Sequence, residues 1–524
     1  MNRLFLHLLL IFLLIQSFCY AQKTNIQWGA LSRGSGVLQA IMPINDVDFY
    51  TLRYSGNNFF GSFYLVEYEN MMRLQSAKVK LVAEQGIANL EKVLTVNKKP
   101  ILFLSDKVSG KLCIYLKELD ENLKASGDIE EIACYKSNKL ISRPEFNVIT
   151  SINNNFFAVI WEVPGKKQNA DVYGFKILDS NLMEFNSGEY VMPFDGNMAT
   201  INQYHLSNTG DFFMSITEHL KPNDRLFSRN FKNFKAMHVY QINKDGLEEF
   251  SLDLQGRRIS GMNMKSNDNN VFTFSGLYAE NDLKRGISGV FYLRINYKEK
   301  NVINKGFIPF AETEINKNWS IGDNRYMKRY RSNNEPELYN YRLRNMEILD
   351  DGSIVGSMEQ YYVYSRTNYD TRSGSSNTIN YYYYDDIVAF KIGKENKFDW
   401  IKIIPKSQTS INDGGPYSSY ANYVDASDLC IIFNDNIKNY DEDGEFKNNQ
   451  KLRTFSLSPR RNAVAMVKID LKTGDLYRST LFQQKQIKSI AVPKLFYVNR
   501  DTKEMILYAI SRGKERFGII QYGK

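Results

Sequence analysis

The chain has 524 residues, with 67 Lys and Arg against 58 Asp and Glu, a formal net charge of +9, and an aromatic content of 14%. A surplus of this size over this length does not indicate a nucleic-acid partner, because nucleic-acid-binding domains carry a much stronger basic footprint. The 34 Tyr and 33 Phe, together with frequent Val, Ile and Thr, favour strands over helices.

Residues 1–21 have the pattern of a signal peptide. Arg3 precedes the apolar run Leu4–Ile15, and Cys19 and Ala21 are small residues at the two positions that a signal peptidase reads. The run is short for a membrane span, and no later stretch is long and apolar enough to be one. We therefore predict an exported protein without a transmembrane segment after cleavage, located in the periplasm, at the periphery of the outer membrane or outside the cell.

Residues 22–524 are predicted to form one domain of repeated four-strand units. By apolar–polar alternation, the units begin at Leu38, Ala88, Asn147, Asn202, Ile259, Tyr341, Tyr420 and Ser489. A four-strand unit that recurs in this way predicts an all-β chain folded as a β-propeller. A two-sheet sandwich is the competing architecture, but it would leave eight similar units without a shared axis. Separate β-domains are the other alternative.

The last unit is short by one strand, which bears on how the ring closes. It contains the strand patterns Ser489–Tyr497, Glu504–Ile510 and Arg516–Tyr522, and Ile26–Leu31 is free to supply a fourth strand. Because an unpaired sheet edge exposes a row of N–H and C=O groups, we expect the N-terminal strand to cover it. This arrangement gives eight blades. Seven blades is the alternative, since the second unit is the least regular.

Four long insertions interrupt the units, at residues 219–235, 311–340, 366–384 and 435–462. They fall between the second and third strands of a unit or between two units. In up-and-down blades both kinds of connection emerge at the same end of the disc. We therefore predict that the insertions share one face, where loops on a rigid frame are suited to carry function.

The sixth unit resembles the blades of secreted bacterial β-propeller proteins. The resemblance rests on Asp385–Ile392 (Asp-Asp-Ile-Val-Ala-Phe-Lys-Ile) and Phe398–Lys406 (Phe-Asp-Trp-Ile-Lys-Ile-Ile-Pro-Lys). Most members of that group have no assigned activity, so the resemblance implies a fold and carries no catalytic residue with it.

Sequence motifs for catalysis are lacking. After residue 21 the histidines are His205, His219 and His238, with no metal-binding spacing, and there is no Gly-x-Ser-x-Gly elbow or phosphate-binding glycine loop. A pair of catalytic carboxylates from different blades would have no characteristic separation in the sequence, so the sequence neither indicates nor excludes such a pair. Cys113 and Cys134 fall in one unit but are not expected to lie opposite each other across a simple hairpin.

Calcium is the one candidate cofactor. Asn439, Asp441 and Asp443, followed by Gly444, alternate as in a calcium loop, where flexible oxygen ligands surround the ion. The match is imperfect, because Gln450 stands where a bidentate Glu is expected, and an ordinary acidic turn is the alternative.

Tyrosines flank the third insertion. Tyr361, Tyr362 and Tyr364 precede a Ser/Gly/Asn-rich segment, predicted to be a flexible loop with its tip at Thr371–Asn380, and Tyr381–Tyr384 follow it. Some of them can simply cover blade flanks. Tyr362 and Tyr364, close to the loop, are candidates for a recognition surface, because Tyr combines large contact area with a hydroxyl group.

Basic residues interleaved with aromatic residues occur in two other insertions. The candidate partner-binding residues there are Arg225, Arg229, Phe231 and Lys232, and Tyr326, Arg329, Tyr330 and Arg331. A solvated rim is the alternative, but Arg beside aromatic anchors is typical of interfaces, and positive charge steers an acidic partner. The predicted partner is an acidic protein or an anionic polymer of the cell envelope.

These patterns support two classes of function. The first is a non-enzymatic binding or scaffolding protein of the bacterial cell envelope that acts through the inserted face. The alternative is an extracellular glycan-active hydrolase with carboxylates around the central channel, or a carbohydrate-binding accessory protein. Convergence of carboxylates in the channel would favour the hydrolase.

Overall fold

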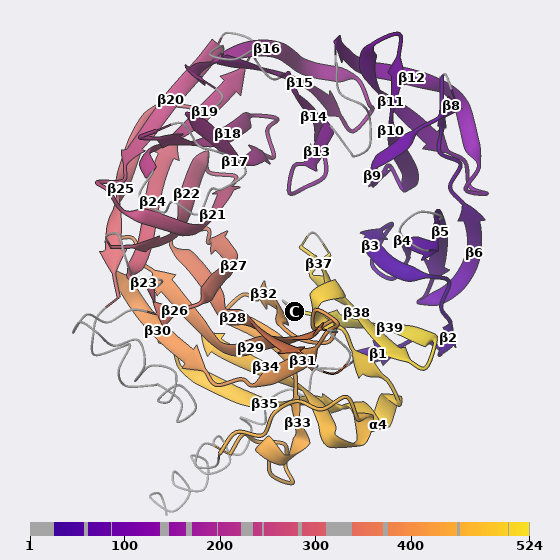
Figure 1. Cartoon of the computed structure of the whole chain (residues 1–524), viewed down its shortest axis with the longest axis vertical. Coiled ribbons are helices and arrows are strands. Elements are labelled where there is room, and N and C mark those ends of the chain that lie inside the picture. The colour runs from indigo at the N-terminus through magenta and orange to yellow at the C-terminus, as the bar shows by residue number, and fades with distance from the viewer. Residues whose placement is uncertain are drawn as a thin grey trace, which may run out of the picture.

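The computed structural model describes residues 26–56, 61–84, 86–136, 146–163, 170–195, 198–221, 234–243, 246–280, 286–310, 338–369, 372, 376–447, 451–500 and 502–522. These residues form eight antiparallel sheets of at least four strands, which stand side by side around a common centre (Figure 1). Each sheet is one blade of a β-propeller. The predicted all-β fold and the eight blades are therefore confirmed.

The first four blades use consecutive strands of the chain. Blade 1 contains β3 (Val37–Pro43), β4 (Phe49–Gly56), β5 (Gly61–Glu69) and β6 (Met72–Lys78); blade 2 contains β9 (Asn89–Val96), β10 (Lys99–Val108), β11 (Lys111–Leu119) and β12 (Ala125–Lys136). Blade 3 contains β13 (Phe146–Thr150), β14 (Phe156–Val163), β15 (Ala170–Asp179) and β16 (Glu184–Asp195); blade 4 contains β17 (Ala199–Leu206), β18 (Phe212–His219), β19 (Phe234–Asn243) and β20 (Gly246–Asp253).

Blades 5 to 7 follow the same order. Blade 5 contains β21 (Arg258–Ser266), β22 (Val271–Ala279), β24 (Gly289–Asn296) and β25 (Asn301–Pro309); blade 6 contains β27 (Tyr341–Ile348), β28 (Ile354–Tyr369), β29 (Ser376–Ile392) and β30 (Phe398–Ile404), with β31 (Gln408–Ile411) beside β29. Blade 7 contains β32 (Tyr420–Val424), β33 (Asp428–Asn436), β34 (Asn462–Asp470) and β35 (Leu476–Gln483). In each blade the first strand lies next to the centre and the fourth lies at the rim (Figure 1).

Blade 8 is assembled from both ends of the chain. It contains β36 (Ile490–Ala491), β37 (Tyr497–Asn499), β38 (Glu504–Ser511) and β39 (Lys514–Gln521), with β1 (Ile26–Trp28) and β2 (Ser32–Arg33) on the outer side of β39. The β1–β39 register runs from Ile26↔Ile520 to Trp28↔Gly518, and the Trp28 ring meets Phe482 of blade 7 at a centroid distance of 5.3 Å. The N-terminal strand therefore covers the edge of β39, as predicted.

The remaining elements are short. They are β7 (Val82–Ala83) with β8 (Gly86–Ile87), β23 (Gly286–Ile287) with β26 (Leu338–Tyr339), the single-turn helix α4 (Gln484–Ile487), and the 3₁₀ turns η1 (Ile437–Asn439), η2 (Pro459–Arg461) and η3 (Pro493–Leu495). None of the helices in the described ranges has the length and hydropathy that a membrane span requires.

The hydrophobic core consists of layers between neighbouring blades. Leu277 and Tyr292 of blade 5, for example, pack in one cluster with Met358 and Phe390 of blade 6. The middle strands have a neighbouring blade on each face, and β33 is accordingly buried along seven of its nine residues, whereas the rim strand β6 is largely exposed. This explains why the middle strands are rich in large apolar residues.

The structure corrects the sequence-based interpretation of the cysteines. Cys113 of β11 and Cys134 of β12 are register partners and form a disulfide. Counting back from the pair Leu119↔Ala125 would place Glu131 opposite Cys113, but two irregularities in the β11–β12 register bring Cys134 there instead. Such bulges insert extra residues in one strand only, and a regular alternation pattern does not reveal them.

Candidate functional site

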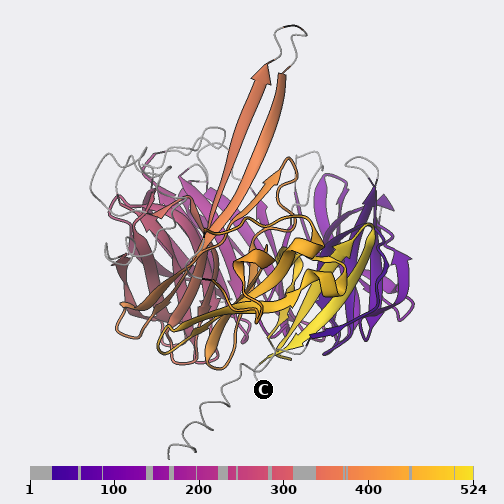
Figure 2. The ribbon, with the colours of Figure 1, turned by 90° about the horizontal axis from the view of Figure 1, so that it is seen from below.

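A two-stranded ribbon stands out from one face of the disc (Figure 2). It is made by β28 and β29, which stay paired as far as Tyr369↔Ser376, well beyond the last pair between β28 and β27, Tyr341↔Gln360. Segment 366–384 was predicted to be an insertion with a flexible tip at Thr371–Asn380. Its described residues, apart from Arg372, are instead strand, because Tyr, Thr and Ile favour extended backbone and continue two strands that the blade already holds in register.

Tyrosine pairs cross the ribbon near its base. Tyr362 stacks on Tyr383 at a centroid distance of 4.6 Å and an interplanar angle of 11°, and Tyr364 lies opposite Tyr381 at 6.0 Å. Opposite residues share a face of the sheet, so both predicted recognition tyrosines, Tyr362 and Tyr364, lie on one face of the ribbon. Tyr364 is 49% exposed. Cross-strand aromatic contacts of this kind stiffen the ribbon while leaving part of each ring open to solvent.

On the other face of the ribbon, at its base, two cationic side chains contact tyrosine rings. Tyr361 packs against Tyr384 at a centroid distance of 4.7 Å, and the guanidinium of Arg342 lies 4.1 Å from the centroid of the Tyr361 ring. Lys494, on η3 of blade 8, places Nζ 4.1 Å from the centroid of the Tyr384 ring and donates to the Tyr384 hydroxyl at 2.9 Å. Partial burial lowers the pKa of Lys494 to about 8.

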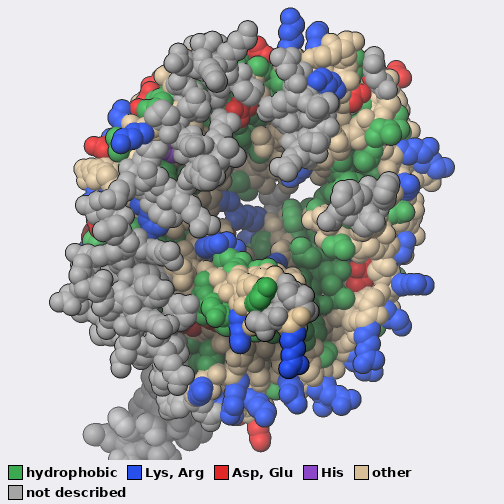
Figure 3. Space-filling model, viewed as in Figure 1, with side chains coloured by type: hydrophobic (Ala, Val, Ile, Leu, Met, Phe, Trp, Pro, Cys, Tyr) green, Lys and Arg blue, Asp and Glu red, His purple; other side chains and the backbone are tan. Residues whose placement is uncertain are grey.

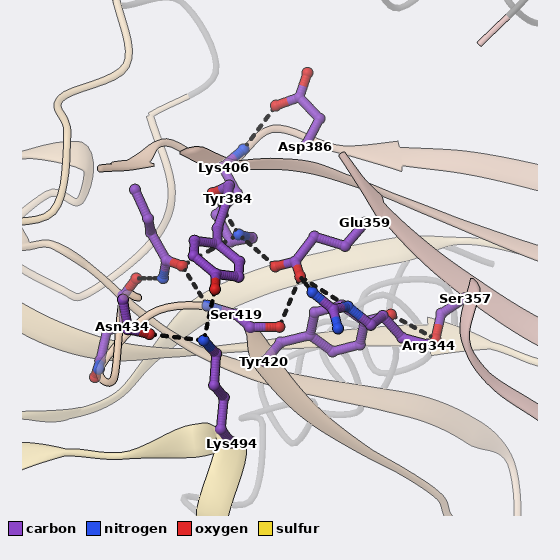
Figure 4. A network of polar contacts seen from close by, with 12 residues as sticks. Arg344, Ser357, Glu359, Tyr384, Asp386, Lys406, Ser419, Tyr420, Asn434 and Lys494 are labelled. Carbon is purple, nitrogen blue, oxygen red and sulfur yellow. Dashed lines mark hydrogen bonds and ion pairs between the residues drawn. The ribbon is translucent and has the colours of Figure 1, made fainter. Parts of the chain in front are cut away.

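Beneath the ribbon lies a buried polar network, drawn in Figure 4. Glu359 of β28 accepts from Lys406 Nζ at 2.9 Å, from Arg344 Nη2 at 2.7 Å and from the Ser419 hydroxyl at 2.7 Å. Lys406 also donates to Tyr384 O at 2.7 Å. Burial would raise the pKa of Glu359, but Lys406 and Arg344 outweigh that effect, so the pKa lies below its ordinary value. The carboxylate is therefore held ionised, as a fixed anchor between blade 6 and the connector to blade 7.

The central channel opens on the same face as the ribbon, and Lys and Arg side chains are visible within it (Figure 3). Arg500, which follows β37 in blade 8, places Nη2 2.6 Å from Oε1 of Glu347 on β27 in blade 6. This ion pair joins blade 8 directly to blade 6, the two neighbours of blade 7. Glu347 and Glu359 are thus both paired with cations.

The described residues contain one cluster of three His, Cys, Asp or Glu side chains whose ligand atoms lie within 4.8 Å of one another: Cys113, Glu131 and Cys134. Its two cysteines form the disulfide, so the cluster does not offer thiolate ligands.

The residues of the predicted calcium loop differ in burial: Asn439 is buried, whereas Asp441 and Asp443 are exposed. Asn439 is buried; its amide donates to Asp435 Oδ1 at 2.8 Å, and its oxygen accepts from the Arg453 N–H at 2.8 Å. Asp441 accepts from the Glu445 N–H at 2.7 Å within an exposed turn, and Asp443 is exposed. These bonds give Asn439 a structural role as well, and calcium binding by Asn439, Asp441 and Asp443 stays a prediction.

The basic and aromatic candidates of the other two insertions lie outside the described residues. They are Arg225, Arg229, Phe231, Lys232, Tyr326, Arg329, Tyr330 and Arg331. Their grouping on the inserted face stays a prediction.

The sequence offered little sign of Glu359, Lys406, Arg344 and Lys494. The one local signal is Glu359 itself, a carboxylate that directly follows the buried stretch Ile354–Met358. A charged side chain in such a strand needs a partner, but the sequence does not indicate that this partner is Lys406, which lies 47 positions away.

No protein-family model and no curated protein matches the chain. Similar solved structures include an oligogalacturonate lyase in complex with manganese, at 11% identity and a TM-score of 0.35, covering 94% of this chain and 99% of that chain. The β-propeller domain of the Trilobed protease from Pyrococcus furiosus is 9% identical with a TM-score of 0.33, covering 72% and 100%. A protein of unknown function from Bacteroides caccae is 10% identical with a TM-score of 0.26, covering 68% and 93%. Likenesses at this level assign no activity to the chain.

Proposed function

We propose that the chain is an exported, non-enzymatic binding protein of the bacterial cell envelope, which holds an acidic protein partner against the ribbon and the face from which it rises. The observation that carries this proposal is the ribbon itself. A stiff arm of stacked tyrosines costs little conformational entropy to immobilise on binding, and Tyr is among the residues enriched in binding hot spots.

The outer edge of β28 suits an extended partner segment. Beyond Gln360, no described strand pairs with that edge. The Tyr361 N–H donates to Asn340 O at 2.9 Å, away from β29, so the N–H groups of residues 363, 365, 367 and 369 have the same outward orientation. A free edge of this kind can accept a partner strand through main-chain hydrogen bonds.

The charge at the base of the ribbon favours an acidic segment. Arg342 and Arg344 of β27 and Lys494 of η3 surround Tyr361 and Tyr384. Of these cations, Arg344 is paired with Glu359, whereas Lys494 is bonded to neutral oxygens. The predicted basic residues Arg225, Arg229, Arg329 and Arg331 would extend the positive surface if they lie on the same face, and would speed the approach of an acidic partner.

The test compares surface variants of the mature protein that keep the ring intact. Tyr362→Ser/Tyr364→Ser removes the exposed ring surface, and Ser365→Pro removes one outward N–H without touching the ladder to β29. Ile303→Ser, at a side chain of β25 that is 53% exposed, is the matched control. We expect cross-linking to one acidic envelope protein, identified by mass spectrometry, to be lost in both ribbon variants and kept in the control.

An anionic polymer is the competing ligand. Retained binding after protease treatment of the envelope fraction, or competition by dextran sulfate but not by polyglutamate, would identify it. Unchanged cross-linking in both ribbon variants would place the binding site elsewhere.

A further inference from the structure

A row of polar side chains crosses blade 5 on the side that faces blade 6. The strand register places Lys265 of β21 opposite Thr273 of β22, and Thr273 opposite Arg294 of β24. Directly opposite residues project from the same face of a sheet. That face is turned to blade 6, because Leu277 and Tyr292, at alternating positions of the same strands, pack in the core shared by the two blades.

Arg294 is buried with its guanidinium 5.7 Å from the centroid of the Tyr292 ring, and two of its nitrogens lack a hydrogen-bond partner among the described residues. The residue is 6% exposed, and its Nε and Nη2 atoms are shielded from solvent and make no hydrogen bond with the described residues. Thr273 is 2% exposed, and its hydroxyl is unpaired in the same way. Buried donors of this kind are costly when left unsatisfied, above all on a charged group.

Neighbouring acids do not satisfy the row. Burial lowers the pKa of Arg294, and Tyr292 and then Asp351, in the β27–β28 turn, offset part of that effect. The Asp351 carboxylate, however, accepts from the N–H of Ser353 at 2.9 Å and from the hydroxyl of that serine. Glu347 is close enough to raise the pKa of Lys265 against the larger lowering by burial, but its carboxylate accepts from Arg500 at 2.6 Å and from Asn345 at 2.8 Å.

The part of blade 6 that packs on this face is apolar, and its Met346 thioether already accepts from the Ser275 hydroxyl at 3.0 Å. The side chains that blade 6 contributes to this core include Met346, Ile354, Phe390 and Ile392, all of them apolar. Burial and the charge of Arg500 lower the pKa of Lys265 to about 8, and the charge of Glu347 offsets only part of that lowering.

We propose that Arg294, Thr273 and Lys265 form a binding site for a small oxyanion: a carboxylate, phosphate or sulfate group. The Nε–H and Nη2–H of a guanidinium are parallel donors that match two oxygens of such a group. Within this chain, Arg344 directs the same two nitrogens at a carboxylate, both of them to Oε2 of Glu359, at 3.0 and 2.7 Å. The Thr273 hydroxyl adds a third donor.

Lys265 supplies the second positive charge. Neighbouring strands lie about 4.8 Å apart, so Lys265 and Arg294 are separated by about 10 Å at their Cα atoms, and both long side chains can reach one anion between them. The row lies next to the β21–β22 turn, at the end of the disc opposite the ribbon. It is therefore independent of the proposed partner site.

The test measures oxyanion binding by the full mature chain. Melting temperature and calorimetric titration are recorded with phosphate, sulfate and acetate, each against sodium chloride at matched ionic strength. At least one oxyanion should raise the melting temperature saturably. Arg294→Met should weaken binding at least about 100-fold, and Thr273→Val about 10-fold, because they remove two charge-assisted hydrogen bonds and one.

Arg257→Met is the matched control, since Arg257 lies in the same blade but is paired with Glu280 at 2.9 Å. It should bind the oxyanion as the unmodified chain does. A response to phosphate and sulfate alone would assign a tetrahedral anion, and a response to acetate alone would assign a carboxylate ligand. No saturable response to any of the three, or the same response in Arg294→Met, would overturn the proposal.

Discussion

Replacing Glu359 with Gln removes the carboxylate that Lys406 and Arg344 share. Removing one partner of a buried ion pair typically costs about 3–5 kcal/mol. The two cations differ in solvent exposure. The Lys406 side chain is 0% exposed, whereas that of Arg344 is 33% exposed and can turn toward water. The cost therefore falls mainly on Lys406, and we expect the free energy of unfolding to drop by about 3 kcal/mol, at the lower end of that range.

A second substitution distinguishes two causes of the loss of stability: the charge of Lys406 left without a counter-ion, and the hydrogen bonds that Glu359 no longer makes. Glu359→Gln/Lys406→Met leaves no buried cation without a counter-ion, so it should be more stable than Glu359→Gln alone by about 1–2 kcal/mol. The assay is urea unfolding followed by intrinsic fluorescence, with variants compared at an unchanged slope against urea. If the double variant is no more stable than the single one, an unpaired Lys406 is not the source of the loss.

The stability that Glu359 contributes through its ion pairs with Lys406 and Arg344 should depend on pH. The pKa of Glu359 in the folded protein lies below its ordinary value of 4.5, so its contribution is complete above about that pH. It is lost as the pH falls through the folded-state pKa, because the unfolded chain then binds the proton more readily. The stability difference between the unmodified chain and Glu359→Gln should therefore shrink on acidification below pH 4.5, and a constant difference would contradict the assignment.

Three further predictions concern closure, the disulfide and calcium. Trp28→Ala removes the partly buried ring that covers Gly518, and should lower stability by about 2–3 kcal/mol in thermal unfolding; an unchanged melting temperature would show that β1 does not hold the ring closed. Paired Ser substitutions of Cys113 and Cys134, 21 positions apart, should cost about 3 kcal/mol, and reduction of the unmodified chain should cost the same. Millimolar calcium should raise the melting temperature of the unmodified chain but not of Asp441→Ala, and no rise in either would remove the calcium site.

The strand order of the blades could be predicted because each middle strand carries its own signal. The apolar content of Phe212–His219 or Asp428–Asn436 follows from burial between two blades, and middle strands of other units, such as Lys99–Val108 and Val271–Ala279, are buried in a similar way. Closure was predictable for a related reason: an exposed edge needs a partner, and Ile26–Leu31 was the strand pattern left over, of which Ile26–Trp28 pairs with β39.

The ribbon and the polar network could not be predicted in the same way. The ribbon has no blade on either side, so it lacks the burial pattern that marks the other strands, and its Ser and Asn residues are typical of loops. It is held by cross-strand contacts, such as Thr367 with Thr378 at 2.9 Å. The network joins residues from three blades and their connectors, and the pairing of Glu359 with Lys406 depends on how the blades pack.

The closing ladder also determines how the ring responds to force. In the antiparallel pair of β1 and β39, Ile26 lies opposite Ile520, so the chain leaves the ladder at the same end on both strands. Tension between the two ends of the chain would pull at right angles to the strands and load one residue pair at a time. The strands would unzip in sequence, from Ile26↔Ile520 to Trp28↔Gly518, and would not resist together in shear. Tension between the two ends of the chain would thus open the ring at blade 8, one residue pair after another.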